Sequence, residues 1–204
     1  MRARRRGSLG IPILFAILIG CAAQGMALAA PEDWDWNYNG VIGRRDAGNK
    51  DWEPFKNYDE IGVEASWGKA DEPLMFATDF FASQDSQRTG NKTLVSNCYE
   101  LDLGLRKIWT FSKRWNPYGG AGFSFANSSA DRSVHGGTES SNDTTYGLWI
   151  GGGIFYRIGM NLNVGIALRA NLMDGYRVFG EDRNANSTHI GLVIGWGAER
   201  GGEK

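Results

Sequence analysis

The sequence predicts an all-β protein, an eight-stranded antiparallel up-and-down transmembrane β-barrel. From Trp34 onward, apolar and polar residues alternate with a period of two, which is typical of strands that separate two environments. The segments between these strands are alternately short and long, as in a barrel with tight turns at one rim and loops at the other. Glycine is also abundant, with 29 residues in a chain of 204.

Residues 1–30 have the layout of an export signal. Several arginines precede an apolar run from Ile11 to Ile19, and small residues follow it. Ala27-Leu28-Ala29 fits the small-x-small rule for cleavage, which would leave residues 31–204 as the barrel domain. Leu18-Ile19-Gly20-Cys21 instead resembles the lipobox of bacterial lipoproteins, which would make Cys21 a lipidation site. Both processing routes stay open at this point.

Composition excludes several classes of protein. Removal of the signal would leave Cys98 as the single cysteine, so a framework of intrachain disulfides is excluded. The formal net charge is −1, and no block of like charges suggests a nucleic-acid-binding arm. Gly151-Gly152-Gly153 precedes no helical pattern, and Walker loops and metal-ligand spacings are missing. We therefore expect no cofactor, no metal and no nucleic acid.

Eight segments carry the alternation. In the clearest one, even-numbered residues from Leu162 to Leu172 are apolar, whereas the odd-numbered residues are asparagine, glycine, alanine or arginine. In chain order, the alternating segments are 34–43, 60–67, 74–81, 98–106, 118–125, 148–158, 160–172 and 189–197. The short connections are 69–73, 112–117 and the region of Gly159, and the long connections are 44–57, 85–97, 127–143 and 173–186.

Alternation alone does not distinguish a membrane barrel from a soluble, lipocalin-like carrier. Six tryptophans lie near the ends of the segments, where amphipathic rings favour a membrane interface: Trp34, Trp36, Trp67, Trp109, Trp115 and Trp196. Glycines would face inward beside Tyr118, Trp149 and Phe155, because an eight-stranded barrel is only just wide enough for side chains. These features favour the membrane barrel, and a soluble or lipid-tethered carrier is the alternative.

Two motifs carry a resemblance to a known family. Pro117-Tyr118-Gly119-Gly120-Ala121-Gly122-Phe123 is similar to a strand, and Phe155-Tyr156-Arg157-Ile158-Gly159 to a turn, of the small outer-membrane barrels of the OmpA transmembrane, OmpX and opacity-protein type. The resemblance implies a monomer in the outer membrane of a Gram-negative-type envelope. The implied partners are outer-membrane lipid, lipopolysaccharide and the barrel assembly machinery.

Charged residues lie on the polar faces of the segments. If these faces line the lumen, the charges need partners there, because a lone buried charge is costly. We therefore predict a structural network across the lumen that plugs the barrel, formed by Glu60, Glu64, Asp79, Glu100, Asp102, Arg106, Arg157 and Arg169. The alternative is that several of them are independent, solvated charges at the rims.

One constellation suggests chemistry. Ser187 and His189 are two residues apart on one face, as a hydrolase pair requires, and Glu181 or Asp182 would orient the histidine. The pair resembles that of outer-membrane lipid A deacylases, although the order of the two residues is reversed and the pair faces inward. A lipid-modifying barrel hydrolase is thus an alternative function.

The main expectation is a barrel without enzymatic activity that anchors four surface loops and has a structural, adhesion or recognition role. The loop 127–143 is rich in serine, asparagine and glycine, and we expect it to be mobile and solvated. Trp52 and Phe55 in the first loop are possible contact aromatics. An extracellular ligand would bind through such loops.

Overall fold

The computed structural model describes residues 34–48, 56–89, 92–112, 114–134, 137–159 and 161–197. The export signal with Cys21, and the loop aromatics Trp52 and Phe55, lie outside these ranges. Within the described ranges, no helix is long and apolar enough to cross a bilayer.

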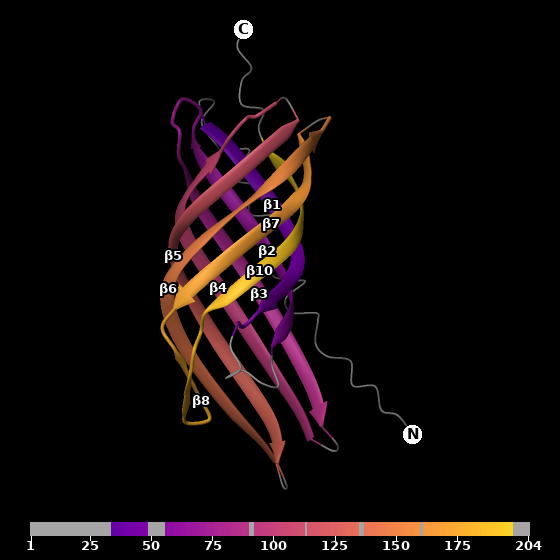
Figure 1. Ribbon diagram of the computed structural model, residues 1–204, viewed down its shortest axis with the longest axis vertical. Coiled ribbons are helices and arrows are strands. Elements are labelled where there is room, and N and C mark those ends of the chain that lie inside the picture. Colours follow the sequence, from indigo (N-terminus) through magenta and orange to yellow (C-terminus); the bar gives the residue numbers. More distant parts are fainter. Residues whose placement is uncertain are drawn as a thin grey trace, which may run out of the picture.

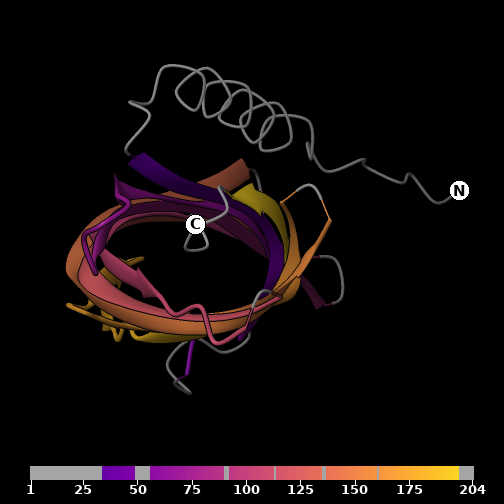
Figure 2. The same ribbon diagram turned by 90° about the horizontal axis from the view of Figure 1, so that it is seen from above.

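Eight strands close into one antiparallel barrel, as the sequence predicts, and Figure 2 shows the ring from above. The strands of the ring are β1 (Trp34–Asp46), β2 (Asn57–Lys69), β3 (Met75–Thr89), β4 (Lys92–Ile108), β5 (Trp115–Val134), β6 (Gly137–Ile158), β7 (Leu162–Met173) and β10 (Ser187–Gly197). Each pairs with its neighbours in sequence order, and β1 closes the ring against β10, with Val41 opposite Val193. A small hairpin, β8 (Tyr176–Val178) and β9 (Glu181–Arg183), follows β7.

The alternation of the sequence separates the two faces of the barrel wall. On β10, Val193 points into the lumen and is 2% exposed, whereas the next residue, Ile194, is 53% exposed on the outside. Most outward side chains in the middle of β4, β7 and β10 are large and apolar, including Leu103, Ile166 and Leu192. An apolar surface of this extent around a whole barrel is typical of contact with lipid and not with water.

Side chains fill the lumen in layers. One apolar cluster, which includes Val41, Phe81, Tyr118 and Phe155, occupies its inner part. A second apolar cluster lies at the mouth on the side of β8 and is built around Tyr176. Buried charged side chains from β1, β2, β3, β4 and β7 lie in the same lumen. A lipocalin-like carrier would need an open apolar cavity here, so the filled and charged lumen argues against that alternative.

The turns at one end are short, as expected. They join β2 to β3, β4 to β5 and β6 to β7. At the last of these turns Asn161 has a φ of 69° and Gly159 a φ of 27°, so the seventh strand begins at Leu162 and not at residue 160. We call this end of the barrel the short-turn end.

The expectation of loops at 85–97 and 127–143 is wrong. β3 and β4 remain paired as far as Thr89 and Lys92, and β5 and β6 as far as Val134 and Gly137. Serine, threonine and asparagine are common in loops, but outside a membrane a strand needs no apolar face. The long hairpins satisfy their backbone hydrogen bonds in the ladder, which a loop of the same composition would leave to water.

These two hairpins project beyond the rest of the barrel (Figure 1). β6 pairs with β7 only as far as Gly147, and β3 pairs with β2 only as far as Gln84. We call the projecting part the hairpin extension: residues 84–89 and 92–97 of β3 and β4, and residues 127–134 and 137–146 of β5 and β6. Residues 137–146 alone correspond to about 33 Å of strand, at ~3.3 Å per residue.

Candidate functional sites: the lumen and the hairpin extension

Arg169 is the centre of a charged cluster in the lumen. It extends from β7 toward β3 and β4 on the opposite wall, and its Nη1 donates to Asp102 Oδ2. The same Nη1 lies 3.7 Å from Glu100 Oε1 and 4.0 Å from Asp79 Oδ2. The guanidinium carbon is 3.5 Å from the centroid of the Phe81 ring. One cation thus links opposite walls of the barrel.

Arg106 on β4 forms the second centre. Its Nη2 donates to Asp79 Oδ2 at 2.6 Å and lies 3.9 Å from Glu64 Oε1, and its Nη1 donates to Ser66 Oγ at 3.0 Å. The Tyr118 hydroxyl donates to Glu64 Oε2 at 3.1 Å. Asp79 lies between the two arginines, so the two centres form one network.

Arg157 lies apart from these two centres, although the sequence placed it in the same network. Its Nε donates to Asn163 Oδ1 at 3.1 Å, and its guanidinium carbon lies 5.5 Å from the Phe155 ring centroid. Asn163 in turn donates to Asn37 Oδ1 on β1 at 2.7 Å. Arg157 therefore belongs to a separate polar group at the short-turn end.

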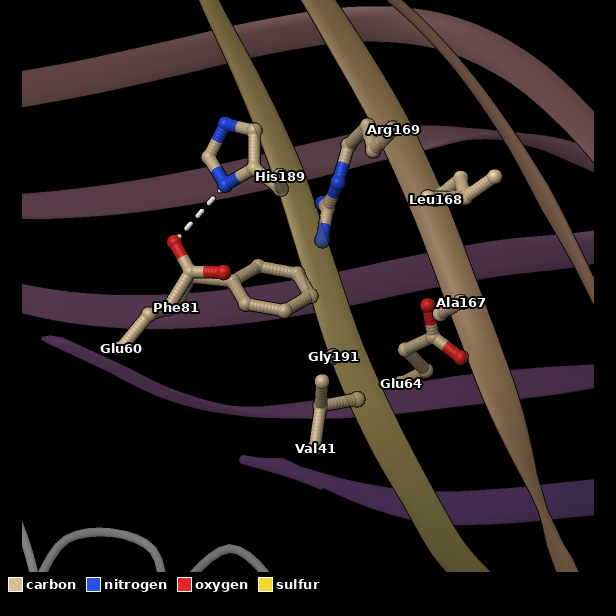
Figure 3. A pocket seen from close by; sticks show the side chains of 9 residues that line it. All are labelled: Val41, Glu60, Glu64, Phe81, Ala167, Leu168, Arg169, His189 and Gly191. Carbon is tan, nitrogen blue, oxygen red and sulfur yellow. Dashed lines mark hydrogen bonds and ion pairs between the residues drawn. The ribbon is translucent and has the colours of Figure 1, made fainter. Parts of the chain in front are cut away.

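Glu60 has a partner that the sequence analysis did not assign. His189 Nδ1 lies 2.7 Å from Glu60 Oε2, and His189 Nε2 lies 3.0 Å from Ser187 Oγ. Figure 3 shows the histidine facing Glu60 beside Arg169. The expectation that Glu181 or Asp182 orients the histidine is wrong, because β9 turns these residues toward other partners. Glu181 accepts from Arg183, and Asp182 from Arg177, each at 3.0 Å.

The order serine, histidine, carboxylate is that of a hydrolase triad, but the surroundings differ from those of an active site. Ser187, His189 and Glu60 are 3%, 5% and 3% exposed. The adjoining cavity, lined by His189, Glu60 and Arg169 among others, has a volume of about 10 Å³ (Figure 3), which is enough for about one water molecule. An acyl substrate has no room at this place, so the geometry supports a hydrogen-bonded chain that joins β2 to β10.

Arg45 is a lumen residue that the sequence analysis assigned to a loop. It is 4% exposed, and its guanidinium carbon lies 5.8 Å from the Tyr58 ring centroid. A signal for it exists, because Asn37, Asn39, Val41 and Arg45 have the same parity along β1. Extending the alternation past Gly43 would have found it.

The hairpin of β8 and β9 forms a cap over the lumen. Tyr176 is 1% exposed and packs with Tyr58, Cys98 and Ala126 in the outer cluster. Its hydroxyl lies 3.6 Å from Cys98 Sγ, and burial raises its pKa well above the ordinary tyrosine value. The Phe179 amide donates to Ser141 Oγ on β6 at 3.1 Å. The cap is therefore attached both to the lumen and to the hairpin extension.

The outer face of β3 to β6 changes character row by row where the membrane-spanning wall passes into the hairpin extension. One row across β3 to β6, the aromatic row, consists of Phe80, Leu101, Phe125 and Tyr146. The next row outward consists of Ala82, Tyr99, Asn127 and Thr144. The row beyond it consists of Gln84, Asn97, Ser129 and Asn142. Apolar side chains thus give way to amides and hydroxyls within two rows.

Among the described residues, histidine, cysteine, aspartate and glutamate side chains form no group that would hold a metal ion. The wall that faces outward is apolar, and the lumen is polar and filled. These properties define a transmembrane β-barrel, with the short-turn end on the periplasmic side and the hairpin extension outside the cell.

Comparison with known proteins gives the same class. No protein-family model matches the chain, and no curated protein matches it in sequence. Among solved structures, Neisserial surface protein A is similar, with a TM-score of 0.55 and 15% identity over 81% of this chain and 97% of that chain. Ail, the attachment invasion locus protein of Yersinia pestis, solved with the heparin analogue sucrose octasulfate, is also similar. Its TM-score is 0.56, with 12% identity over 81% of this chain and 99% of that chain.

The fold is thus that of the small eight-stranded outer-membrane β-barrels, and the resemblance of the two sequence motifs is confirmed at this level. With its apolar outer wall, the chain is an integral protein of the bacterial outer membrane.

Proposed function

We propose that the barrel is a sealed anchor and that the protein acts through its hairpin extension, in adhesion or recognition. The observation that carries this proposal is strand length. β5 has 20 residues and β6 has 22, whereas a membrane-spanning strand needs ~9–11. The additional residues of β5 and β6 are not needed to span the membrane. They form a paired surface that projects from the bilayer.

The filled lumen supports the sealed part of the proposal. Arg169 links opposite walls, and the cap around Tyr176 covers the mouth. In planar bilayers we expect the folded protein to give no large, steady conductance. A steady open current from protein that also shows heat-dependent mobility on gels would overturn the sealed anchor.

The adhesion part is tested by shortening one hairpin. Residues 131–140 are replaced by an Asn-Gly turn, which suits a two-residue hairpin connection. The shortened protein should keep its heat-dependent mobility, because the membrane-spanning parts of the strands are intact. Cells that display it should bind less well than wild-type cells to at least one surface in a panel of saccharide-coated and protein-coated wells. Equal binding to every surface would reject the adhesion role.

The alternative of a lipid-modifying hydrolase depends on Ser187. Because the cavity beside His189 has room for about one water molecule, we expect Ser187→Ala to leave the mass spectrum of lipid A unchanged from that of cells with the wild-type protein. A difference in acylation between the two would revive the hydrolase.

A further inference from the structure

The central lumen contains more acidic than basic side chains. Within the part of the chain that the structure describes, five carboxyl groups there are at most 5% exposed: Glu60, Glu64, Asp79, Glu100 and Asp102. Three buried guanidinium groups face them, those of Arg45, Arg106 and Arg169. If every carboxyl were ionised and His189 were neutral, the lumen would hold an excess of two negative charges. An uncompensated buried charge is costly, and a titratable group in that position takes up a proton instead.

The other titratable side chains that face the lumen do not offset this excess. Asp35 on β1 and Arg157 on β6 have opposite charges and lie at the short-turn end. Asp85 lies in the hairpin extension, where both of its carboxylate oxygens accept from Gln87. The phenols and the thiol of the lumen are uncharged near neutral pH: Tyr58, Tyr118, Tyr176 and Cys98.

The register of the strands brings the carboxyl groups close together. Asp79 on β3 is directly opposite Glu64 on β2 and directly opposite Asp102 on β4. Like charges in directly opposite positions destabilise a sheet. The single nitrogen Nη1 of Arg169 lies within 4.0 Å of oxygens from Asp79, Glu100 and Asp102. Carboxyl groups that share a site in this way do not all ionise readily.

Several oxygens of this group have no hydrogen-bond partner among the described residues. They are Asp79 Oδ1, Asp102 Oδ1 and both carboxylate oxygens of Glu100. An ionised carboxylate can only accept hydrogen bonds, whereas a protonated carboxyl group can also donate one. His189 is a further place for a proton, because its Nδ1 lies 2.7 Å from Glu60 Oε2 and its Nε2 lies 3.9 Å from Glu100 Oε2. Added protons would therefore provide donors where the lumen has only acceptors.

We propose that the sealed lumen is a proton-binding site, which holds two protons at neutral pH, shared among the five carboxyl groups and His189. Because these groups interact strongly, the two protons belong to the whole group and not to two particular residues. They are taken up from water when the barrel folds and return to water when it unfolds. Carboxyl groups of the unfolded chain are ionised near pH 7, so the folded state binds more protons, and its stability falls as the pH rises. The site thus couples the stability of the barrel to the pH, and it does not depend on the adhesion role.

The experiment counts the protons that the full barrel releases when urea unfolds it in phosphatidylcholine vesicles. The release is measured with a glass electrode in weak buffer at about pH 7, where carboxyl groups of the unfolded chain are ionised. Urea titrations at a series of pH values give a second readout, the unfolding equilibrium constant. Asp102→Asn removes one carboxyl group of the lumen. The matched control is Asp182→Asn, which removes a carboxyl group with a side chain 78% exposed.

The wild-type barrel and Asp182→Asn should each release about two protons, and the unfolding constant should rise about a hundredfold per pH unit while both protons are bound. Asp102→Asn should release about one proton, and its unfolding constant should rise about tenfold per pH unit. Glu100→Gln has the same expected result and replaces Asp102→Asn if that variant does not fold.

A wild-type barrel that unfolds without releasing protons would overturn the proposal. If its stability instead rose with sodium concentration at constant pH, an inorganic cation would be the counter-charge of the lumen. A variant that lacks one lumen carboxyl group and still releases about two protons would also overturn the proposal, because the protons would then be bound elsewhere.

Discussion

At the scale of single residues, Arg169 shows how the lumen is held together. It lies within 4.0 Å of three carboxylates from two strands on the opposite wall. Buried ion pairs add little net stability when both partners are present, but removal of one partner leaves an uncompensated buried charge. The cost of losing Arg169 should therefore be much larger than its net contribution.

We expect Arg169→Met to lower the free energy of unfolding by about 3–5 kcal/mol, because Asp102 and Glu100 lose their cation. Urea unfolding in lipid vesicles measures this change. Arg177→Met is the matched control, because that arginine pairs with Asp182 on the surface with a side chain 69% exposed. Its loss should cost under ~1 kcal/mol. Similar decreases in unfolding free energy for both variants would contradict the network. In addition, the double variant Arg169→Met and Asp102→Asn should be more stable than Arg169→Met alone, because one of the unpaired carboxylates is removed.

The glycines of the lumen are a second feature at this scale. A Cβ added to Gly165 would meet the backbone of β6, where it would lie 2.2 Å from Ile154 O and 2.6 Å from Phe155 Cα. We expect Gly165→Ala to lower the unfolding free energy by about 1–3 kcal/mol through overpacking, as measured by urea unfolding. Gly137→Ala is the control, because a Cβ there meets nothing within 4 Å. A Gly165→Ala barrel as stable as the wild type would mean that the backbone of β6 shifts at little cost.

At the scale of elements, the small hairpin β8–β9 covers the mouth of the lumen. Its Tyr176 closes the outer cluster over Cys98, which is 2% exposed. The hairpin also gives the extension a contact on its inner side, through Ser141. Without the hairpin, the mouth of the lumen and one side of β6 would lose their cover.

We expect Tyr176→Ala to make Cys98 reactive toward a maleimide in the folded barrel. Truncation of a buried aromatic side chain costs about 3 kcal/mol, which corresponds to roughly a hundredfold increase in local opening. Labelling is followed by mass spectrometry in a Cys21→Ser background. Arg177→Ala on the same hairpin should not change the rate, because its side chain is exposed. Rapid labelling of Cys98 in the wild-type barrel would contradict the conclusion that the hairpin β8–β9 caps the lumen.

At the scale of the whole molecule, the distribution of polarity is the reverse of that in a soluble barrel. Leu168 is 55% exposed in the middle of β7, and the adjacent Arg169 is 8% exposed. In water this arrangement would be unfavourable on both faces. In a bilayer the apolar side chains contact lipid, and the charges find partners in the lumen.

Leu168→Arg tests this arrangement. A lipid-facing arginine near the bilayer midplane should lower the unfolding free energy in vesicles by about 2–4 kcal/mol. Thr144→Arg, facing outward on β6 beyond the aromatic row, should cost ~0–1 kcal/mol. In a soluble barrel both would be surface substitutions worth ~0.5 kcal/mol or less, so equal and small effects would contradict the membrane-spanning wall.

Sequence alone determined the strands, their two faces and the apolar outer wall. These features follow from the period of two in the sequence, which is a local property. The alternation is clear because each strand has a bilayer on one side and a narrow lumen on the other. The same alternation placed Asp102 and Arg169 on inward faces. Local reasoning failed at 85–97 and 127–143, because serine and asparagine are as frequent in solvated strands as in loops.

Only the tertiary structure decided which inward side chains meet. His189 and Glu60 are 129 residues apart in sequence and lie on the two strands that flank β1. Their contact depends on the closure of β1 against β10 and on the register of each pair of strands. The same closure separated Arg157 from the two arginine centres and lined up the amides of four strands on one outer face. Register and closure are properties of the whole ring, so no single segment specifies them.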